Sequence, residues 1–566
     1  MCYNASRRGS RRRFFDCSLP LQHQRRYRTA DRPTRASSAW GPLAEPVFRA
    51  LWLAALVSNV GTLMQSVAAA WLMTSLTTSP VPVALLTTMG SLPIFLVGLP
   101  AGALADVVDR RWLVLMTQVW MLIVAAVLSG LTAMSWMSPT LLLALTFTLA
   151  LGGALSAPAW QAIVPQLVSR RQLAAAVALN SAGFNLARAV GPALGGLLVA
   201  AAGPAAVFIL NALSFLGIMI VIYRWKPAPR DPGAVPERVG SAVAAGIRFT
   251  RHSPPLRAVL VRTAAFIFAG SALWALLPVV ATQQLGQSAL GYGIMLGSIG
   301  LGAVGGAAIM PRMRERLSPD QIVTVLTLVF AAGTLGLAYI SNFLLLNIVL
   351  VAVGLAWLTI TSSLNVTAQT TVPAWVMARA LGVYLLVFQG GFAGGSAVWG
   401  IVAEQFGNRA ALVVAAVMLV AGVVTALRWH LLSDEDVDLR PSQHRSPPQL
   451  ENQPNIEEGP VLVTVEYRVP ERHHEAFQQA MQEMQVIRLR DGATRWGLFH
   501  DAAQANRFLE TFIVPSWGEH LRQLERSTVA DKIIEEQAFK LQEPGTSPAM
   551  AHFISTQSVR PRQPEA

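Results

Sequence analysis

Residues 172–223 read QLAAAVALNSAGFNLARAVGPALGGLLVAAAGPAAVFILNALSFLGIMIVIY and contain a single charged residue, Arg188. This stretch is long enough for two membrane-spanning helices of about 20 residues each with a turn between them. The glycine and proline in AAGPAA at 201–206 favour a turn near its middle. The stretch therefore predicts a helical hairpin that crosses a lipid bilayer twice.

Five further stretches share this very low charge, at 50–105, 112–169, 263–311, 321–378 and 380–427. Over all 566 residues, 53% are hydrophobic and only 13% are charged, about half the charge of an average soluble domain. A soluble bundle would need charged outer faces, which these stretches lack. Six hairpins predict an all-α polytopic membrane protein with twelve transmembrane helices.

The two sets of six predicted helices are related in sequence. At an offset of 204 residues, several glycines and an arginine recur in order: Gly102, Arg110, Gly191, Gly196 and Gly203 fall on Gly306, Arg314, Gly395, Gly400 and Gly407. Such repeats are typical of transporters whose binding site lies between two pseudo-symmetric halves. The expected architecture is therefore two pseudo-symmetric six-helix halves.

Basic residues gather in the connections between hairpins, whereas the turns within hairpins hold one, Arg409. By the positive-inside rule, both termini and the central loop are expected in the cytoplasm, and the chain in the cytoplasmic (inner) membrane as a multi-pass protein. The net charge of +13 then reflects topology and indicates no nucleic-acid partner. Cys2 and Cys17 are the only cysteines, so neither a disulfide framework nor a cysteine metal site is expected.

Composition divides the chain into seven parts. We expect a disordered basic tail (1–44), an N-terminal six-helix half (45–224), a cytoplasmic central loop (225–257), a C-terminal six-helix half (258–430), a polar linker (431–458), a soluble domain (459–545) and a disordered tail (546–566). Within the central loop, GSAVAAGIRFTRH at 240–252 predicts a short amphipathic helix.

The soluble domain begins with VLVTVEYRV at 461–469, which alternates like a β-strand. A helical pattern follows at 471–488, then strand-like runs at 493–500 and 507–514, and two more helical segments up to 540. The order βαββα predicts a small α+β domain of the ferredoxin-like type.

GALADVVDRR at 102–111 lies where the second span returns to the cytoplasm. It resembles the signature loop between helices 2 and 3 of the major facilitator superfamily, and the matching residues are Gly102, Asp106, Arg110 and Arg111. Asp109 stands where that motif has a glycine. The resemblance implies that Asp106 lies against the start of helix 11 and gates the cytoplasmic side, because a helix N-terminus favours a carboxylate. The structural alternative is that these charges only mark the membrane edge.

ARAVGPALGG at 187–196 resembles the exporter-associated motif in helix 5 of the same superfamily, with matches at Gly191, Pro192, Gly195 and Gly196. Small residues let helices approach closely, so the segment is expected to seal and pivot between the halves. A plain packing face would explain the same glycines. Arg188 lies roughly 25 Å along the helix from Arg171, within the membrane, where a charge usually faces a cavity or a partner. It is expected either to anchor an anionic or polar substrate or to bond neighbouring carbonyls or Glu404.

Five segments, which include the two motifs as well as PAWQAIVPQLV and NALSFLG, extend the resemblance over about residues 45–430 to the branch of the superfamily that includes the enterobactin exporter. This implies proton-driven export of siderophores or other amphipathic small molecules. No Asp or Glu lies deep in the spans, so the residue that carries a coupling proton is open. Polar residues inside the spans either line a cavity or join helices by hydrogen bonds. The candidates for the substrate cavity are Arg188, Asn59, Gln65, Asn185 and Gln389.

The soluble domain resembles small dimeric α+β barrels that include antibiotic-biosynthesis monooxygenases. That resemblance allows dimerisation through this domain. Trp496, His500, Trp517 and His520 are residue types found in enzyme pockets, but they form no metal-binding or nucleophile pattern. The chain is therefore expected to be no enzyme and to need no cofactor or metal. An importer, a transporter fused to a monooxygenase-like enzyme, and a non-transporting scaffold stay open as alternatives.

Overall fold

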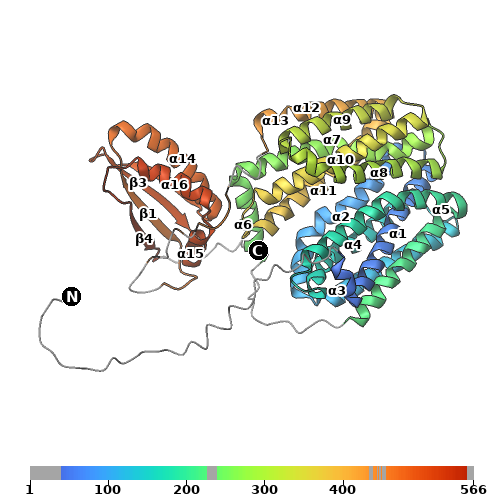
Figure 1. Cartoon of the computed structure of the whole chain (residues 1–566), viewed down its shortest axis with the longest axis horizontal. Coiled ribbons are helices and arrows are strands. Elements are labelled where there is room, and N and C mark those ends of the chain that lie inside the picture. Colours follow the sequence, from blue (N-terminus) through green and yellow to red (C-terminus); the bar gives the residue numbers. More distant parts are fainter. Residues whose placement is uncertain are drawn as a thin grey trace, which may run out of the picture.

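The computed structural model describes residues 40–225, 239–431, 438–442, 444, 448 and 454–556. It contains a bundle of long helices and a smaller domain built on a sheet (Figure 1). The bundle comprises α1 (Pro46–Leu76), α2 (Pro80–Val107), α3 (Arg110–Ala133), α4 (Pro139–Leu167), α5 (Leu173–Arg224), α6 (Val239–His252), α7 (Pro254–Val279, continued by a π-turn at Val280–Gln284), α8 (Ala289–Arg314), α9 (Pro319–Tyr339), α10 (Phe343–Thr370), α11 (Met377–Phe406), α12 (Asn408–Val423) and α13 (Thr425–Arg428). Nearly all of the expected basic tail at 1–44 lies outside the described residues.

Eleven helices among the described residues are long and apolar enough to cross a membrane. One of them, α5, has 52 residues, and at about 1.5 Å per residue it would far exceed a hydrocarbon core of roughly 30 Å. It is interrupted at Gly203, whose φ of 79° and ψ of 170° are not helical. Pro204 follows directly, and proline is favoured where a helix begins. The interruption therefore lies inside the turn predicted at 201–206.

Polar side chains cap the helices that follow other breaks in the bundle. Ser138, Ser288 and Asn342 each accept a hydrogen bond from the backbone N–H three residues later, at the starts of α4, α8 and α10. Such caps satisfy N–H groups that have no partner within the helix. The local sequence thus fixes where these apolar helices start.

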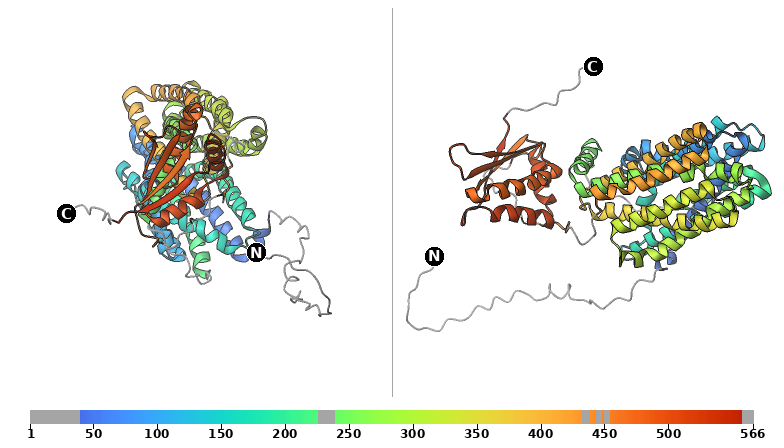
Figure 2. Two further views of the ribbon diagram at one scale, coloured as in Figure 1. Left: turned by 90° about the vertical axis from the view of Figure 1, so that its left-hand side faces the viewer. Right: turned by 90° about the horizontal axis from the view of Figure 1, so that it is seen from above.

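The helices form two groups, with α1–α5 in one and α7–α12 in the other (Figure 1). Contacts of α5 with α8 and of α2 with α11 join the groups. Figure 2 places the sheet domain beyond one end of the bundle, next to α6. We call this the domain end, and the opposite end, which holds the connection between α1 and α2, the far end.

Hydrogen bonds bridge the two groups at the far end. The Ser79 hydroxyl donates to Oε2 of Glu404 at 2.6 Å, and Nε2 of Gln283 donates to the carbonyl of Thr78 at 2.8 Å. Ser79 and Thr78 precede α2, whereas Glu404 ends α11 and Gln283 follows α7. The far end of the bundle is therefore tied across the groups.

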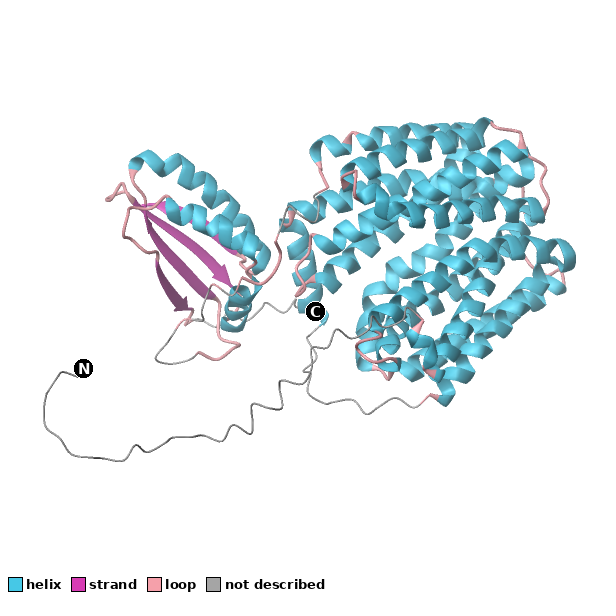
Figure 3. Ribbon diagram, viewed as in Figure 1, coloured by secondary structure: helices cyan, strands magenta, loops and turns pink. Residues whose placement is uncertain are grey.

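The C-terminal domain comprises β1 (Val461–Arg468), α14 (His474–Asp491), β2 (Arg495–His500), β3 (Arg507–Val514), α15 (Trp517–Arg526), α16 (Val529–Lys540) and β4 (Ala549–Ile554). The strands form one antiparallel sheet in the order β2-β3-β1-β4. α14 and α16 lie on one face of this sheet (Figure 3). Alternate residues of β1, from Val461 to Tyr467, are buried under the helices, as their alternation in the sequence predicts.

Strand β4 corrects the predicted end of this domain. The tail at 546–566 was expected to be disordered, yet β4 pairs with β1, with Leu462 opposite Phe553. The residues of β4 are exposed or half-buried, so no buried and exposed alternation marks them as a strand. The expected linker is also ordered in part, because the N–H of Val529 donates to the carbonyl of Arg440 at 2.9 Å.

Helix α6 confirms the short amphipathic helix predicted at 240–252, and the C-terminal domain packs on it. Arg248 of α6 forms a 3.0 Å ion pair with Glu519 of α15. Phe249 is buried and meets Trp375 edge-on, with ring centroids 5.8 Å apart. The guanidinium of Arg526 lies 4.4 Å from the centroid of the same Trp375 ring. The domain is thereby attached to α6 and to the segment that precedes α11.

Candidate functional site

A cavity of about 460 Å³ lies between the two helix groups. Its walls come from α1, α2, α4 and α5 on one side and from α7, α8, α10 and α11 on the other. The lining is mostly apolar, and the volume lies in the range of about 300–1,000 Å³ usual for small-molecule sites. This cavity is the candidate substrate site.

Arg188 is the one charged side chain among the described residues that line this cavity. Its guanidinium lies 5.0 Å from the centroid of the Phe184 ring, one turn earlier on α5. No described residue accepts a hydrogen bond or ion pair from Arg188, and its expected structural partner Glu404 accepts from Ser79 instead. A charged arginine at the centre of a membrane helix costs about 2.5–3.5 kcal/mol on insertion scales. The position therefore suits a site that receives a ligand.

Aromatic side chains from the α7–α12 group form one wall of the cavity. Trp357 packs against Trp274 with ring centroids 5.3 Å apart and against Phe392 at 5.9 Å. Phe388 and Phe392 stack at 6.5 Å. No motif in the sequence marks this wall. The one local sign of it is that Phe388 and Phe392 are four residues apart, which places both rings on the same face of a helix.

Two polar atoms of the cavity-lining residues have no hydrogen-bond partner among the described residues. Nε1 of Trp274 and Oγ1 of Thr146 are buried and bond to no described residue, and both residues line the cavity. An unpaired buried donor usually costs about 1–3 kcal/mol. Both atoms are therefore available to a ligand that accepts hydrogen bonds.

The remaining polar candidates separate into different places. Gln389 lines the cavity together with Arg188. Gln65 is buried and accepts a 2.5 Å hydrogen bond from Nδ2 of Asn211, so it joins α1 to α5. Asn59 and Asn185 are half-buried and are not among the lining residues. Of the five predicted cavity residues, the structure brings Arg188 and Gln389 to one cavity.

The exporter-motif glycines allow close helix contacts on two sides of α5. A β-carbon on Gly191 would lie 2.9 Å from Cβ of Leu63, and one on Gly195 would lie 2.8 Å from Cα of Met64. Real Cβ atoms essentially never come that close. These two glycines therefore let α5 pack directly on α1, while Pro192 between them lines the cavity.

Gly196 faces the other helix group. A β-carbon there would lie 2.6 Å from the carbonyl oxygen of Ala289 and 2.9 Å from Cα of Gly293. Further along α8, a β-carbon on Gly300 would lie 2.9 Å from Cα of Ala189. Glycines on both helices thus bring α5 and α8 into backbone contact, and this contact closes the bundle beside the first turn of α8, at the far end.

Gly102 and Asp106 lie in the last turns of α2. Apart from the neighbouring backbone of α2 itself, no described atom lies within 4 Å of the position where a β-carbon on Gly102 would stand. The side chain of Asp106 lies outside the described residues, so its expected contact with the start of α11 stays a prediction.

The neighbouring residues join α3 to the end of α5. Asp109 accepts hydrogen bonds from the backbone N–H groups of Arg111 and Trp112, at 2.8 and 3.3 Å, and so caps α3. Nε of Arg111 donates to the carbonyl of Ile222 at 3.1 Å, and its Nη2 donates to that of Tyr223. Asp109 therefore gives the loop an N-cap where the superfamily motif has a glycine. Arg110 begins α3 directly after it.

Comparison with known proteins shows the family of this chain. Residues 37–560 match the sequence profile of a family described as transmembrane secretion effectors, which are transporters of the major facilitator superfamily. The chain belongs to this family. This secretion effector is therefore a multi-pass membrane transporter.

Two relatives and one solved structure illustrate the likeness. The secretion effector is 28% identical over 365 residues to the multidrug efflux pump Tap of Mycolicibacterium fortuitum, covering 61% of this chain and 84% of Tap. It is 28% identical over 362 residues to the enterobactin exporter EntS of Escherichia coli, covering 63% of this chain and 85% of EntS. A bacterial homologue of the human lysosomal transporter Spinster, inward-facing and occupied, is 16% identical with a TM-score of 0.56, covering 69% of this chain and 98% of that one. This structural similarity shows that the two chains share a fold.

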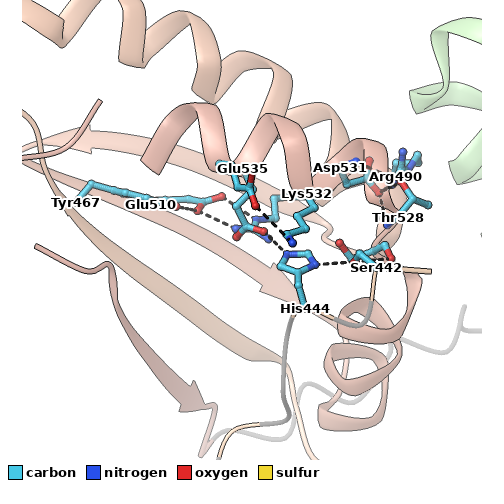
Figure 4. Close-up of polar contacts among 12 residues, drawn as sticks. Ser442, His444, Tyr467, Arg490, Glu510, Thr528, Asp531, Lys532 and Glu535 are labelled. Atoms are coloured by element: carbon cyan, nitrogen blue, oxygen red, sulfur yellow. Dashed lines mark hydrogen bonds and ion pairs between the residues drawn. The ribbon is translucent and has the colours of Figure 1, made fainter. Parts of the chain in front are cut away.

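A buried ion pair, Arg488 with Glu510, lies in the interior of the C-terminal domain; Figure 4 shows its Glu510 next to Tyr467. Glu510 of β3 accepts hydrogen bonds from Nε of Arg488 at 2.9 Å, from the hydroxyl of Tyr467 at 2.9 Å and from Nε1 of Trp496 at 2.9 Å. Burial raises the pKa of Glu510, but the charge of Arg488 and these hydrogen bonds outweigh it and hold the pKa below its usual value. The carboxylate of Glu510 is thus ionised, and its oxygens accept hydrogen bonds from side chains inside the domain.

The aromatic residues considered for an enzyme pocket lie in separate clusters. Trp496 donates to the buried carboxylate of Glu510. Trp517 and His520 pack with His552. His500 packs instead against the rings of His474 and Phe508. Among the residues that the structure describes, no three His, Cys, Asp or Glu side chains group closely enough to hold a metal ion.

Proposed function

We propose that this transporter exports siderophore-like or other amphipathic small molecules by alternating access, driven by a proton gradient. The central cavity carries the proposal, because both helix groups line it and the far end beside it is tied shut by Ser79 and Glu404. A site between two groups that rock against each other opens to one side at a time. The functions of the two relatives, multidrug efflux and enterobactin export, support outward transport.

For the architecture, we propose twelve crossings in two pseudo-symmetric six-helix halves. Division of α5 at Gly203 turns eleven apolar helices into twelve. The two groups, α1–α5 and α7–α12, then hold six spans each. The α5–α8 and α2–α11 contacts are equivalent under the sequence repeat, because Gly102 of α2 corresponds to Gly306 of α8 and Gly191 of α5 to Gly395 of α11.

For the orientation, we propose that the domain end faces the cytoplasm, with both termini, and that the far end faces outward. The arginine-bearing connections support this, because Arg170 and Arg171 precede α5 while Arg312 and Arg314 end α8, on the side away from the far end. In bacteria the membrane would be the cytoplasmic (inner) one.

We propose that Asp106, with Gly102, Arg110 and Arg111, gates the domain end. Replacing Asp106 with asparagine is expected to slow transport at least tenfold without changing protein yield, because asparagine has no charge to interact with the dipole of α11. Asp109→Asn is the matched control, since asparagine also caps helices. Flux is measured in vesicles that contain equal amounts of each protein, and full flux in Asp106→Asn would leave the loop as a marker of the membrane edge.

Transport by everted vesicles separates this function from its rivals. With an imposed gradient that is acidic inside, an exporter accumulates the neutral dye Nile red in the vesicles, whereas an importer releases it. A non-transporting scaffold would show no movement of Nile red that depends on the gradient. Vesicles without the protein provide the baseline.

For the C-terminal domain, we propose pairing with a second copy and no catalysis. The buried Arg488–Glu510 pair fills its interior, while the open face of the sheet carries exposed Phe499 and Phe553 beside half-buried Leu462. This face suits a second copy, because the domain resembles dimeric α+β barrels.

Light scattering on the detergent-solubilised protein tests the pairing. We expect two chains per particle, and one chain after Phe553→Asp, which places a charge on the open face. Ile533→Asp is the matched control, because Ile533 is equally exposed but lies on α16. A single chain in the unmodified protein would contradict pairing.

A further inference from the structure

The cavity contains one positive charge and no negative charge among its described lining residues. Arg188 supplies the positive charge, and no Asp or Glu belongs to the lining. The ring of Phe184 provides a cation–π contact but no counter-charge. A cationic ligand would therefore meet repulsion in this cavity, whereas an anion would find an unpaired guanidinium in a surrounding of low dielectric constant.

The unpartnered polar atoms favour the same sign of charge. Nε1 of Trp274 can only donate a hydrogen bond, and the hydroxyl of Thr146 can donate one. They come from α7 and α4, on opposite sides of the cavity, and neither has a partner among the described residues. A carboxylate has several acceptor positions and can satisfy more than one donor at once.

The aromatic wall adds a requirement for shape. Trp274, Trp357 and Phe392 form a continuous series of ring contacts beside the cavity. Aromatic rings pack on such surfaces by offset stacking or edge contacts. A ligand that combines a ring with an anionic group would use both the wall and Arg188.

We propose that this cavity binds organic acids that carry one carboxylate and an aromatic ring system, with the carboxylate at Arg188 and the rings on the wall of Trp274, Trp357 and Phe392. Turnover of such acids rests on the proposed transport function, whereas their binding does not. The substrate class is therefore narrower than amphipathic molecules in general.

Calorimetric titration of the full-length protein in detergent tests the charge preference. The probes are 1-naphthoate, the neutral 1-naphthamide and the cationic 1-naphthylmethylamine, which share one ring system. We expect 1-naphthoate to bind at least tenfold more tightly than either of the others. Equal or tighter binding of the amide or the amine would overturn the proposal.

Variants then locate the anion. Arg188→Gln is expected to weaken 1-naphthoate at least tenfold and to change 1-naphthamide less than twofold, whereas Arg188→Lys keeps the preference for the acid. Arg171→Gln is the matched control, because Arg171 is exposed just before the same helix. If Arg188→Gln weakens acid and amide alike while Arg188→Lys binds neither, Arg188 is structural and the proposal fails.

Removal of one donor provides an independent measurement. Trp274→Phe keeps the ring but loses the N–H, and we expect 1-naphthoate to bind three- to tenfold more weakly. Trp120→Phe is the control, because Trp120 is exposed and its Nε1 donates to the carbonyl of Thr148. An unchanged affinity in Trp274→Phe would show that this N–H donates no hydrogen bond to the ligand.

The two proposals fail in different ways. If vesicles move Nile red but the protein does not prefer 1-naphthoate, transport stands and the substrate class is wrong. If the protein prefers 1-naphthoate but vesicles move neither Nile red nor 1-naphthoate in response to the gradient, the site stands and the proposed function is wrong.

Discussion

Replacement of Gly196 by alanine is expected to reduce transport more than tenfold. The new β-carbon would lie 2.6 Å from the carbonyl oxygen of Ala289 and 2.9 Å from Cα of Gly293. These are backbone atoms, which cannot rotate away as a flexible side chain does. Helices α5 and α8 must therefore separate at the far end, and the closed arrangement becomes less stable.

Cysteine labelling measures this loss of closure directly. With Cys2 and Cys17 changed to serine, a cysteine at cavity residue Ser66 should react several-fold faster from outside in Gly196→Ala. Gly217→Ala is the matched control on the same helix, because its β-carbon would lie 3.6 Å from Cβ of Ala54, an ordinary contact. Equal labelling and transport in both variants would show that close contact at Gly196 does not seal the bundle.

Replacement of Glu510 by alanine is expected to destabilise the C-terminal domain by about 3–5 kcal/mol. The change leaves the guanidinium of Arg488, which is 1% exposed, without its partner in the interior. It also removes the acceptor of Tyr467 and Trp496. Hydrogen exchange in the intact chain should therefore accelerate by about a hundredfold or more in β1 and β3.

The control for this ion pair lies on the same sheet. Glu466 pairs with Arg507 at 2.8 Å, but both side chains are partly exposed, so Glu466→Ala is expected to cost less than about 1 kcal/mol. If the amides of β1 and β3 exchange at the same rate in both variants, burial does not make the Arg488–Glu510 pair more stabilising than the exposed pair.

The pH dependence of the domain follows from the lowered pKa of Glu510. Its contribution to stability is fully present above the ordinary pKa of an unfolded glutamate, about 4.3. That contribution is lost as the pH falls through the lower pKa of the folded state. The protection factor of β1, which corrects for the slower intrinsic exchange at lower pH, should therefore fall below about pH 4, and Glu510→Ala should lack this acid-dependent fall.

The sequence predicted the apolar helices and their turns because length, low charge and turn residues act locally. It also identified Arg188, because an isolated charge in a membrane helix is unusual however the helices pack. It could not separate Gln389 from Gln65, because both are amides within spans. Only the position of Asn211 on a neighbouring helix decides that Gln65 joins helices.

Neither the unpartnered donors of Trp274 and Thr146 nor the strand β4 could be predicted from the sequence, because both depend on contacts between distant segments. Whether Nε1 of Trp274 or Oγ1 of Thr146 finds an acceptor depends on helices distant in sequence. The strand β4 has little buried alternation, so its pairing with β1 decides its structure. The cap formed by Asp109, by contrast, had a local signal, since aspartate is favoured just before a helix.

A single residue, Ser253, separates α6 from α7, and α6 carries the C-terminal domain through Arg248 and Glu519. In the proposed alternating access the domain would therefore travel with α7–α12. It is a water-exposed domain attached to one half of a molecule whose helices are otherwise covered by detergent. An antibody fragment bound to it would orient particles in electron micrographs, and a fluorophore on it would report displacement relative to the connection between α2 and α3.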